Sequence, residues 1–203
     1  MNVNRDFLVC GIDEAGRGPL AGPVVAAAVI LPPGCPVDGL ADSKKLTETR
    51  RRKLATELQR HAWIGLGIAE PEEIDRLNIL HATMTAMRRA CLNLPALPQK
   101  AEIDGNRIPE HMPCEAEAIV KGDTKVAAIS AASIIAKTVR DDLMLLAEAR
   151  FPGYGFARHK GYPSPSHKDA LMRLGPCPIH RRSYAPVRQA TESAQSGDAN
   201  HCG

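Results

Sequence analysis

An α/β fold is predicted for this 203-residue chain by three observations. Short apolar runs with the length of strands alternate with longer runs whose apolar residues recur at helical spacing. Hydrophobic residues make up 44% of the chain, which at this length can bury one good core. Carboxylates directly follow several of the apolar runs, at the loops where ligand sites of α/β sheets gather. We therefore expect one domain, with at most a small appendage.

The first two predicted strands flank a glycine-rich turn. Residues 7–12 form one apolar run and residues 24–31 form a second, β-branched one, so we expect them to pair across the turn. A polar segment then leads into a helix over residues 48–61, with Thr47 as its N-cap. The other predicted elements are strands over 63–69, 101–103 and 115–120, a helix over 79–94, and a long helix over 126–146 that is rich in small apolar residues.

The charge of the chain is concentrated near its C-terminus. The net charge is −2 over residues 1–120, +7 over 121–188 and −2 over 189–203. A basic region of this kind indicates a polyanionic partner. The tail from residue 189 is rich in Ser, Gln, Asn and Gly, and we expect it to be disordered because it has too few apolar side chains.

The cysteine pattern and the apolar runs suggest where the protein works. Six cysteines are scattered along the chain with no C-x-x-C pair, which argues against a zinc site and against a disulfide framework. No apolar run approaches the length of a membrane span, and the first residues do not resemble a signal peptide. We expect a cytoplasmic protein that does not bind membranes.

The most informative motif is a pair of carboxylates before a glycine turn. Asp13 and Glu14 are expected at the end of the first strand, where the chain leaves the core. Gly16 and Gly18 lack a Cβ, so the backbone there can approach a ligand closely, and Arg17 offers a planar fork of donors to a phosphate or sugar oxygen. Carboxylates beside a phosphate would repel it unless a divalent ion lay between them.

Two further carboxylates occupy the same kind of position. Asp104 follows the predicted strand 101–103, and Asp123 follows the predicted strand 115–120. An acidic residue at a strand end is commonly only a turn former or a helix cap. The recurrence of this placement predicts that Asp104 and Asp123 meet Asp13 and Glu14 in one cleft.

Seven segments carry a family resemblance. They are Asp13-Glu14-Ala15-Gly16-Arg17-Gly18-Pro19, Asp42-Ser43-Lys44-Lys45-Leu46, Ile103-Asp104-Gly105-Asn106, Lys121-Gly122-Asp123, Ser130-Ala131-Ala132-Ser133-Ile134-Ile135-Ala136-Lys137, His159-Lys160-Gly161-Tyr162-Pro163 and His180-Arg181-Arg182-Ser183. In this order and spacing the chain resembles the type 2 ribonucleases H, specifically bacterial ribonuclease HII, from about residue 9 to residue 188. Ribonuclease HIII differs by a Gly-Lys-Gly turn and an extra N-terminal domain.

The resemblance implies a ribonuclease H-like fold. It implies a mixed five-stranded sheet flanked by helices and a small C-terminal helical region. Residues 1–188 would then form a single catalytic domain, in which the basic region 150–188 binds substrate and residues 189–203 are the disordered tail. It also implies a metal-dependent endonuclease that cleaves the RNA strand of RNA/DNA hybrids and cuts at single ribonucleotides embedded in duplex DNA. The products would carry 5′-phosphate and 3′-hydroxyl ends, and the sequence identifies no protein partner.

The resemblance also assigns the site residues. The metal-binding and catalytic carboxylates would be Asp13, Glu14, Asp104 and Asp123, and Mg²⁺ or Mn²⁺ is expected because oxygen ligands suit hard cations. The substrate-binding residues would be Gly16, Arg17, Gly18, Lys44, Lys137 and Tyr162. The two lysines would contact phosphates, and the tyrosine would stack on the deoxyribose that follows the ribonucleotide. Taken on residue type alone, most lysines are merely solvated and such a tyrosine can simply cover a helix.

Three other functions remain open from the residues alone. A hybrid-binding protein without catalysis would use the same basic region but would gain nothing from four carboxylates. A nucleotide hydrolase would also want glycine turns and Mg²⁺, but the G-x-x-x-x-G-K-[ST] pattern is absent. A resolvase or integrase of similar fold would share the acidic site, and the Gly-Arg-Gly turn and Tyr162 speak against it.

Overall fold

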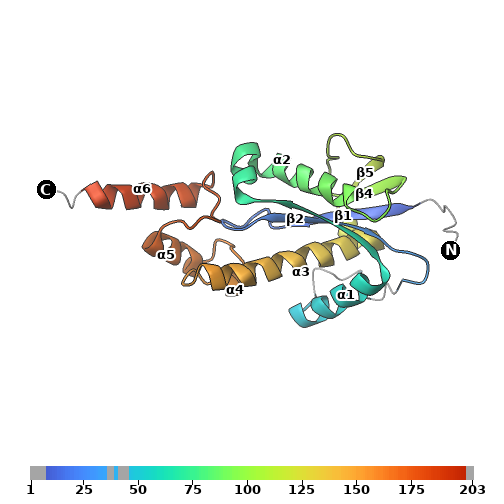
Figure 1. Ribbon diagram of the computed structural model, residues 1–203, viewed down its shortest axis with the longest axis horizontal. Coiled ribbons are helices and arrows are strands. Elements are labelled where there is room, and N and C mark those ends of the chain that lie inside the picture. The colour runs from blue at the N-terminus through green and yellow to red at the C-terminus, as the bar shows by residue number, and fades with distance from the viewer. Residues whose placement is uncertain (1–7, 36–38, 41–45, 200–203) are drawn as a thin grey trace.

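A mixed five-stranded sheet forms the centre of the protein (Figure 1). The computed structural model describes residues 8–35, 39–40 and 46–199. The strands are β1 (Val9–Ala15), β2 (Val24–Ile30), β3 (Trp63–Ala69), β4 (Lys100–Asp104) and β5 (Glu115–Ile119). Their order is β3-β2-β1-β4-β5; β2 is antiparallel to β1 and β3, whereas β1, β4 and β5 run parallel. The predicted pairing of the first two strands and the α/β class are confirmed.

Helices cover both faces of the sheet (Figure 1). Helix α2 (Pro71–Leu92) lies on one face, and helices α3 (Ala127–Arg150) and α1 (Glu48–His61) lie on the other. Alternate residues of β2 enter the two cores, as the pleat requires. Ile30 is buried beneath α2, and Val29 is buried beneath α3. At Gly11 a Cβ would lie 2.2 Å from the carbonyl carbon of Ala128, so this glycine lets α3 contact β1 closely.

Two predicted helix starts are explained by side-chain caps. The Thr47 hydroxyl accepts a hydrogen bond from the Arg50 amide at 3.3 Å, which confirms it as the N-cap of α1. The sequence places the next helix at residues 79–94, whereas α2 begins at Pro71. The backbone of Asn78 is non-helical, with φ 66°, and its side chain caps the amides of Leu80 and His81. The apolar pattern therefore detected only the segment after this kink.

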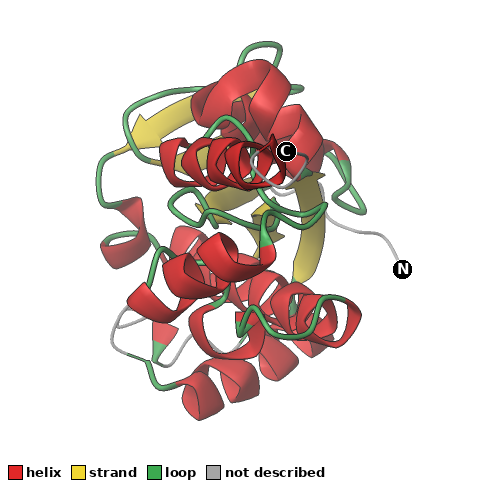
Figure 2. Cartoon of the chain, turned by 90° about the vertical axis from the view of Figure 1, so that its left-hand side faces the viewer, coloured by secondary structure: helices red, strands yellow, loops and turns green. Residues whose placement is uncertain are grey.

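Three short helices form the C-terminal region. They are α4 (Phe156–His159), α5 (Pro165–Leu174) and α6 (Ala185–Ala199), at the end of the molecule that faces the viewer in Figure 2. The expectation of disorder from residue 189 is wrong up to Ala199, because α6 continues through it. Val187 and Ala190 are buried against Leu20 and Leu171, so a few apolar residues suffice to dock this helix. None of the helices within the described ranges is long and apolar enough to cross a membrane.

Candidate active site

The paired carboxylates lie inside a strand. The sequence predicts that the first strand ends at residue 12, but β1 continues to Ala15, because Asp13 and Glu14 pair in register with residues of β2. Neighbouring side chains of a strand point to opposite faces. Ile12 packs in the core beneath α2, so Glu14 faces the same side and Asp13 faces α3. The hydroxyl of Ser133 on α3 donates to the Asp13 carboxylate.

Both carboxylates are held in a weakly solvated position. Asp13 is only 6% exposed, and burial together with the negative charges of Glu14 and Asp104 raises its pKa well above its usual range. Burial likewise raises the pKa of Glu14, although the guanidinium of Arg17, 3.3 Å from Glu14 Oε1, opposes this rise. The second oxygen of Glu14, Oε2, is buried and has no hydrogen-bond partner among the described residues. Such a site favours a cation.

Asp104 and Asp123 meet at the neighbouring strand end. Asp104 is the last residue of β4, which runs parallel to β1, so it reaches the same edge of the sheet as Asp13. Its Oδ1 accepts hydrogen bonds from the amides of Gly122 at 2.7 Å and Asp123 at 3.4 Å. Asp123 lies in a short 3-10 turn (Gly122–Thr124) and is 1% exposed. Asp104 therefore fixes the loop that carries Asp123.

The structure brings three of the four predicted carboxylates together. Glu14 and Asp104 line one cavity, and their charges act on Asp13, whereas Asp123 lines a different, small cavity. In the described part of the chain, no three acidic, histidine or cysteine side chains already stand in an arrangement that could hold a metal ion. The donor set nevertheless fits a hard divalent cation, because it offers only oxygen and because one buried oxygen of Glu14 lacks a partner.

The glycine turn beside the carboxylates is tightly enclosed. Gly16 has φ +102°, and a Cβ there would lie 2.1 Å from Arg140 Nε and 2.7 Å from the carbonyl oxygen of Pro23. A Cβ on Gly18 would lie 3.6 Å from the ring of Tyr162. Only glycine fits at position 16, and the turn is placed directly beside the tyrosine.

Two fully buried arginines hold this turn. Arg181 donates hydrogen bonds to the carbonyl oxygens of Gly16, Arg17 and Gly22, at 2.5 to 3.0 Å. Arg140 donates to further carbonyls of the turn and of the segment before the tyrosine, namely Pro23, Ala21 and Lys160. Arg181 is 0% exposed and therefore does not contribute to the positive surface of the basic region. Both guanidinium groups donate their hydrogen bonds to backbone carbonyls. These carbonyls are distant in the sequence, so a local motif does not predict the contacts.

The predicted substrate-binding residues line a second cavity. Its volume is about 410 Å³, and it adjoins the carboxylate cavity through Glu14 and Arg17, which line both. Its other lining residues are Ala15, Gly16, Gly18, Arg51, Ser133, Ile134, Lys137 and Tyr162. No site role was predicted for Arg51 or Ser133. Ser133 lies one helical turn before Lys137 on α3, a spacing that places both on one face. Lys44 lies outside the described residues.

Lys137 and Tyr162 lie side by side in this cavity. Lys137 Nζ is 5.8 Å from the centre of the Tyr162 ring and forms an ion pair with Asp141 at 2.6 Å. Tyr162 is 42% exposed, so one part of its ring is open to a ligand. The arrangement combines a cation and an aromatic face, which suits a sugar-phosphate chain.

A buried hydrogen-bond chain positions the tyrosine backbone. The Cys177 amide donates to His180 Nδ1 at 3.0 Å, so the proton of a neutral His180 resides on Nε2. That nitrogen is 3.1 Å from His167 Nε2, and His167 Nδ1 is 2.9 Å from the carbonyl oxygen of Tyr162. Each group has one donor and one acceptor only while both histidines are neutral. These hydrogen bonds therefore hold the backbone of Tyr162 in place only when His167 and His180 are both neutral.

We expect the buried hydrogen bonds of His180 and His167 to make the free energy of unfolding depend on pH. Burial and the neighbouring His167 lower the pKa of His180 to about 4, whereas an unfolded histidine titrates near its ordinary value. Between these values the unfolded state binds more protons, so stability is lost as the pH falls from about 6.5 to about 4, by on the order of 2–3 kcal/mol. Urea unfolding at several pH values checks this. His180→Asn should flatten the pH dependence, and parallel curves for the two proteins would contradict it.

Comparisons with known proteins agree on one family. The family model described as ribonuclease HII matches residues 10–187. A ribonuclease HII of Maricaulis maris is 67% identical over 195 residues, which cover 96% of this chain and 89% of the relative. A ribonuclease HII of Parvibaculum lavamentivorans is 59% identical over 90% of this chain and 68% of its own length.

Two solved structures are similar to this fold. The ribonuclease H2 of Pyrococcus horikoshii has a TM-score of 0.76 and 28% identity, covering 93% of this chain and 99% of its own. The ribonuclease HII in a PCNA complex from Archaeoglobus fulgidus has a TM-score of 0.75 and 28% identity, covering 87% and 95%. The predicted five-stranded mixed sheet flanked by helices is therefore confirmed as ribonuclease H-like.

Proposed function

This chain belongs to the ribonuclease HII family and is an endoribonuclease of RNA/DNA hybrids, and on that premise we propose that it also cuts at single ribonucleotides embedded in duplex DNA. The products would carry 5′-phosphate and 3′-hydroxyl ends. The observation that supports this function is a carboxylate cavity joined to a cavity that presents a glycine turn, a lysine and a tyrosine. Residues 1–188 would act as one catalytic domain in the cytoplasm, with 150–188 binding substrate.

The metal ligands are proposed from the chemistry of the acidic residues. Members of this family depend on divalent metal, and Asp13, Glu14, Asp104 and Asp123 would together hold Mg²⁺ or Mn²⁺. When bound, such ions supply an activated water and neutralise the charge that develops on the phosphate and the leaving 3′ oxygen. The unpartnered oxygen of Glu14 and the raised pKa of Asp13 support this assignment, because a nearby cation would favour both charged carboxylates.

The remaining site residues would bind and orient the substrate. The backbone of Gly16 and Gly18 would offer donors and acceptors to the 2′-hydroxyl, which distinguishes RNA from DNA. Arg17 would hold a phosphate or sugar oxygen with its guanidinium fork once a metal neutralises Glu14. Lys137 would contact a phosphate, as would Lys44. Because Lys137 Nζ stands over the ring of Tyr162, the same substrate segment could contact both.

The proposed function is tested with a labelled DNA duplex that carries one ribonucleotide. We expect a single cut at the ribonucleotide in the presence of Mg²⁺ or Mn²⁺ and none with a chelator. An all-DNA duplex of the same sequence is the control and should remain intact. Cleavage of the all-DNA duplex, or cleavage that survives removal of the metal, would contradict the proposal.

Tyr162 is expected to distinguish the two substrates. Replacing Tyr162 with Ala removes a stacking surface worth on the order of 1 to 3 kcal/mol. Cutting at a single embedded ribonucleotide should fall by about tenfold or more, and cutting of a long hybrid should fall less, because a long hybrid offers many positions without a junction. Rates on both substrates, with Tyr162→Phe as the matched control that keeps the ring, provide the measurement. Equal losses would mean that Tyr162 supports general binding only.

A further inference from the structure

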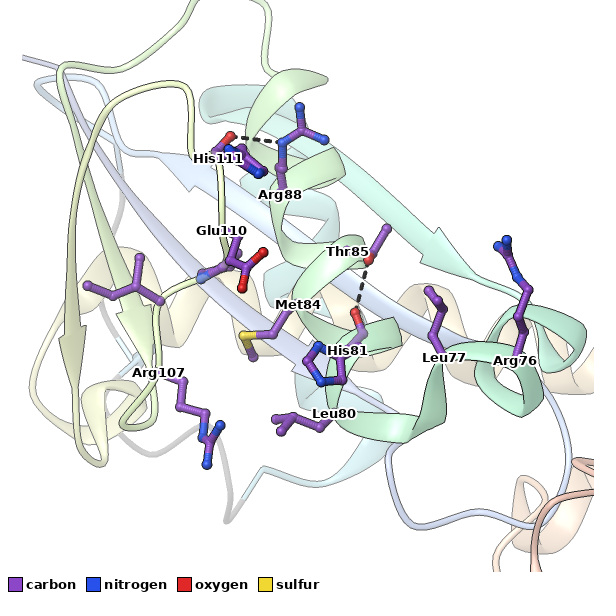
Figure 3. Close-up of a pocket in the computed structure, with 12 residues that line it drawn as sticks. Arg76, Leu77, Leu80, His81, Met84, Thr85, Arg88, Arg107, Glu110 and His111 are labelled. Carbon is purple, nitrogen blue, oxygen red and sulfur yellow. Dashed lines mark hydrogen bonds between the residues drawn. The ribbon is translucent and has the colours of Figure 1, made fainter.

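A groove lies beside the carboxylate cavity, between helix α2 and the loop over residues 105–114 (Figure 3). Its volume is about 510 Å³. Leu77, Leu80 and Met84 line it from α2, and Ile108 lines it from the loop with 47% of its surface exposed. We call this the α2 groove. It has an apolar lining that the carboxylate chemistry does not use.

The α2 groove carries an excess of positive charge. Among its lining residues, Arg76 and Arg88 come from α2 and Arg107 comes from the loop, against one carboxylate, Glu110. Arg76, whose side chain is 72% exposed, also pairs with Glu73 at 3.7 Å. Figure 3 shows Arg88 at one end of the groove and Arg107 toward the other. Arg88 Nε donates to the carbonyl oxygen of His111 at 2.8 Å, which joins the helix to the loop and fixes this guanidinium at the edge. Such an array complements a polyanion.

The α2 groove is continuous with the catalytic site. Leu80, Met84 and Arg107 line both this groove and the cavity that contains Glu14 and Asp104. From Leu80 to Arg88 the helix rises by about 12 Å, at 1.5 Å per residue, which corresponds to roughly three or four base pairs of duplex. A substrate cut at the carboxylates can therefore extend over the arginines.

We propose that the α2 groove binds the sugar-phosphate backbone of the duplex that flanks the cut site. Arg76, Arg88 and Arg107 contact phosphates, and the apolar lining packs against sugars. This inference rests on the proposed function, since it takes the position of the nucleic acid from the catalytic cavity. It assigns the α2 groove to recognition of flanking duplex, in addition to the contacts at the ribonucleotide itself.

The test removes two of the three charges, in the variant Arg76→Gln/Arg107→Gln. Binding without metal is measured on duplexes with one ribonucleotide and either four or fourteen base pairs on one side, in both orientations. We expect the parent protein to prefer the longer flank on one side only. The variant should lose that preference, with about tenfold weaker binding of the long duplex, and its salt dependence should flatten by about two phosphate contacts.

A matched variant controls for net charge. Lys53→Gln/Arg60→Gln removes two charges from exposed positions of α1, on the opposite face of the sheet, and should leave the flank preference unchanged. The proposal is overturned if Arg76→Gln/Arg107→Gln keeps the parent's flank preference and salt slope, or if it weakens short and long duplexes equally. Binding is measured without metal and therefore without cleavage. A negative binding result thus contradicts only the role of the α2 groove, whereas a negative cleavage result contradicts the proposed function.

Discussion

Replacing Asp104 with Asn is expected to lower cleavage by at least about 100-fold while the protein remains folded. The amide keeps one carbonyl oxygen in the place of Oδ1, so the hydrogen bonds from the Gly122 and Asp123 amides can persist. What is lost is a negative charge next to Asp13 and Glu14, and with it part of the proposed affinity for a divalent cation. Single-turnover cleavage in Mg²⁺ and in Mn²⁺, together with a melting curve, checks both statements.

Asp142→Asn is the matched control for this change. Asp142 is a half-exposed carboxylate on α3 that pairs with Arg52 at 2.6 Å and does not line the carboxylate cavity. Its replacement should leave cleavage within about twofold of the parent, because surface ion pairs contribute little. A near-parental rate for Asp104→Asn would show that Asp104 is not a ligand.

Replacing Arg181 with Met is expected to destabilise the protein by on the order of 3–5 kcal/mol. The side chain is fully buried, and its loss leaves the carbonyl oxygens of Gly16 and Gly22 without their side-chain donor, whereas the Arg17 carbonyl keeps the Tyr184 hydroxyl at 2.8 Å. For a chain of this size the melting temperature should fall by about 10 °C or more. Cleavage should fall as well, because the glycine turn loses its support.

The neighbouring Arg182 provides the control. It is exposed, and the contact that the structure records for it is made by its backbone amide to Asp75 at 2.8 Å. Arg182→Met should therefore change stability by no more than about 0.5 kcal/mol. Equal destabilisation by the two substitutions would refute the role given to Arg181.

The fold class and the acidic pair were predictable because their signals are local. A continuous run of apolar, partly β-branched residues marks β2, and a hydroxyl three residues before a free amide marks the start of α1. The strand limit at residue 12 was wrong because Asp13 and Glu14 are polar, while their backbone pairs with β2 regardless of side-chain polarity. The expectation of disorder was wrong for residues 189–199, because the docking of α6 depends on a surface formed elsewhere in the chain.

The sequence by itself determined the class of chemistry, since the carboxylates, the glycine turn and the basic lysine are fixed by residue type and spacing. Only the tertiary structure decided which arginines are buried against backbone carbonyls and which line an open groove. Arg181 reaches carbonyls about 160 residues away in the chain, and the arginines of the α2 groove come together only because α2 packs beside the loop after β4. Contacts between such distant segments depend on how helices pack on the sheet, which no local pattern of residues encodes.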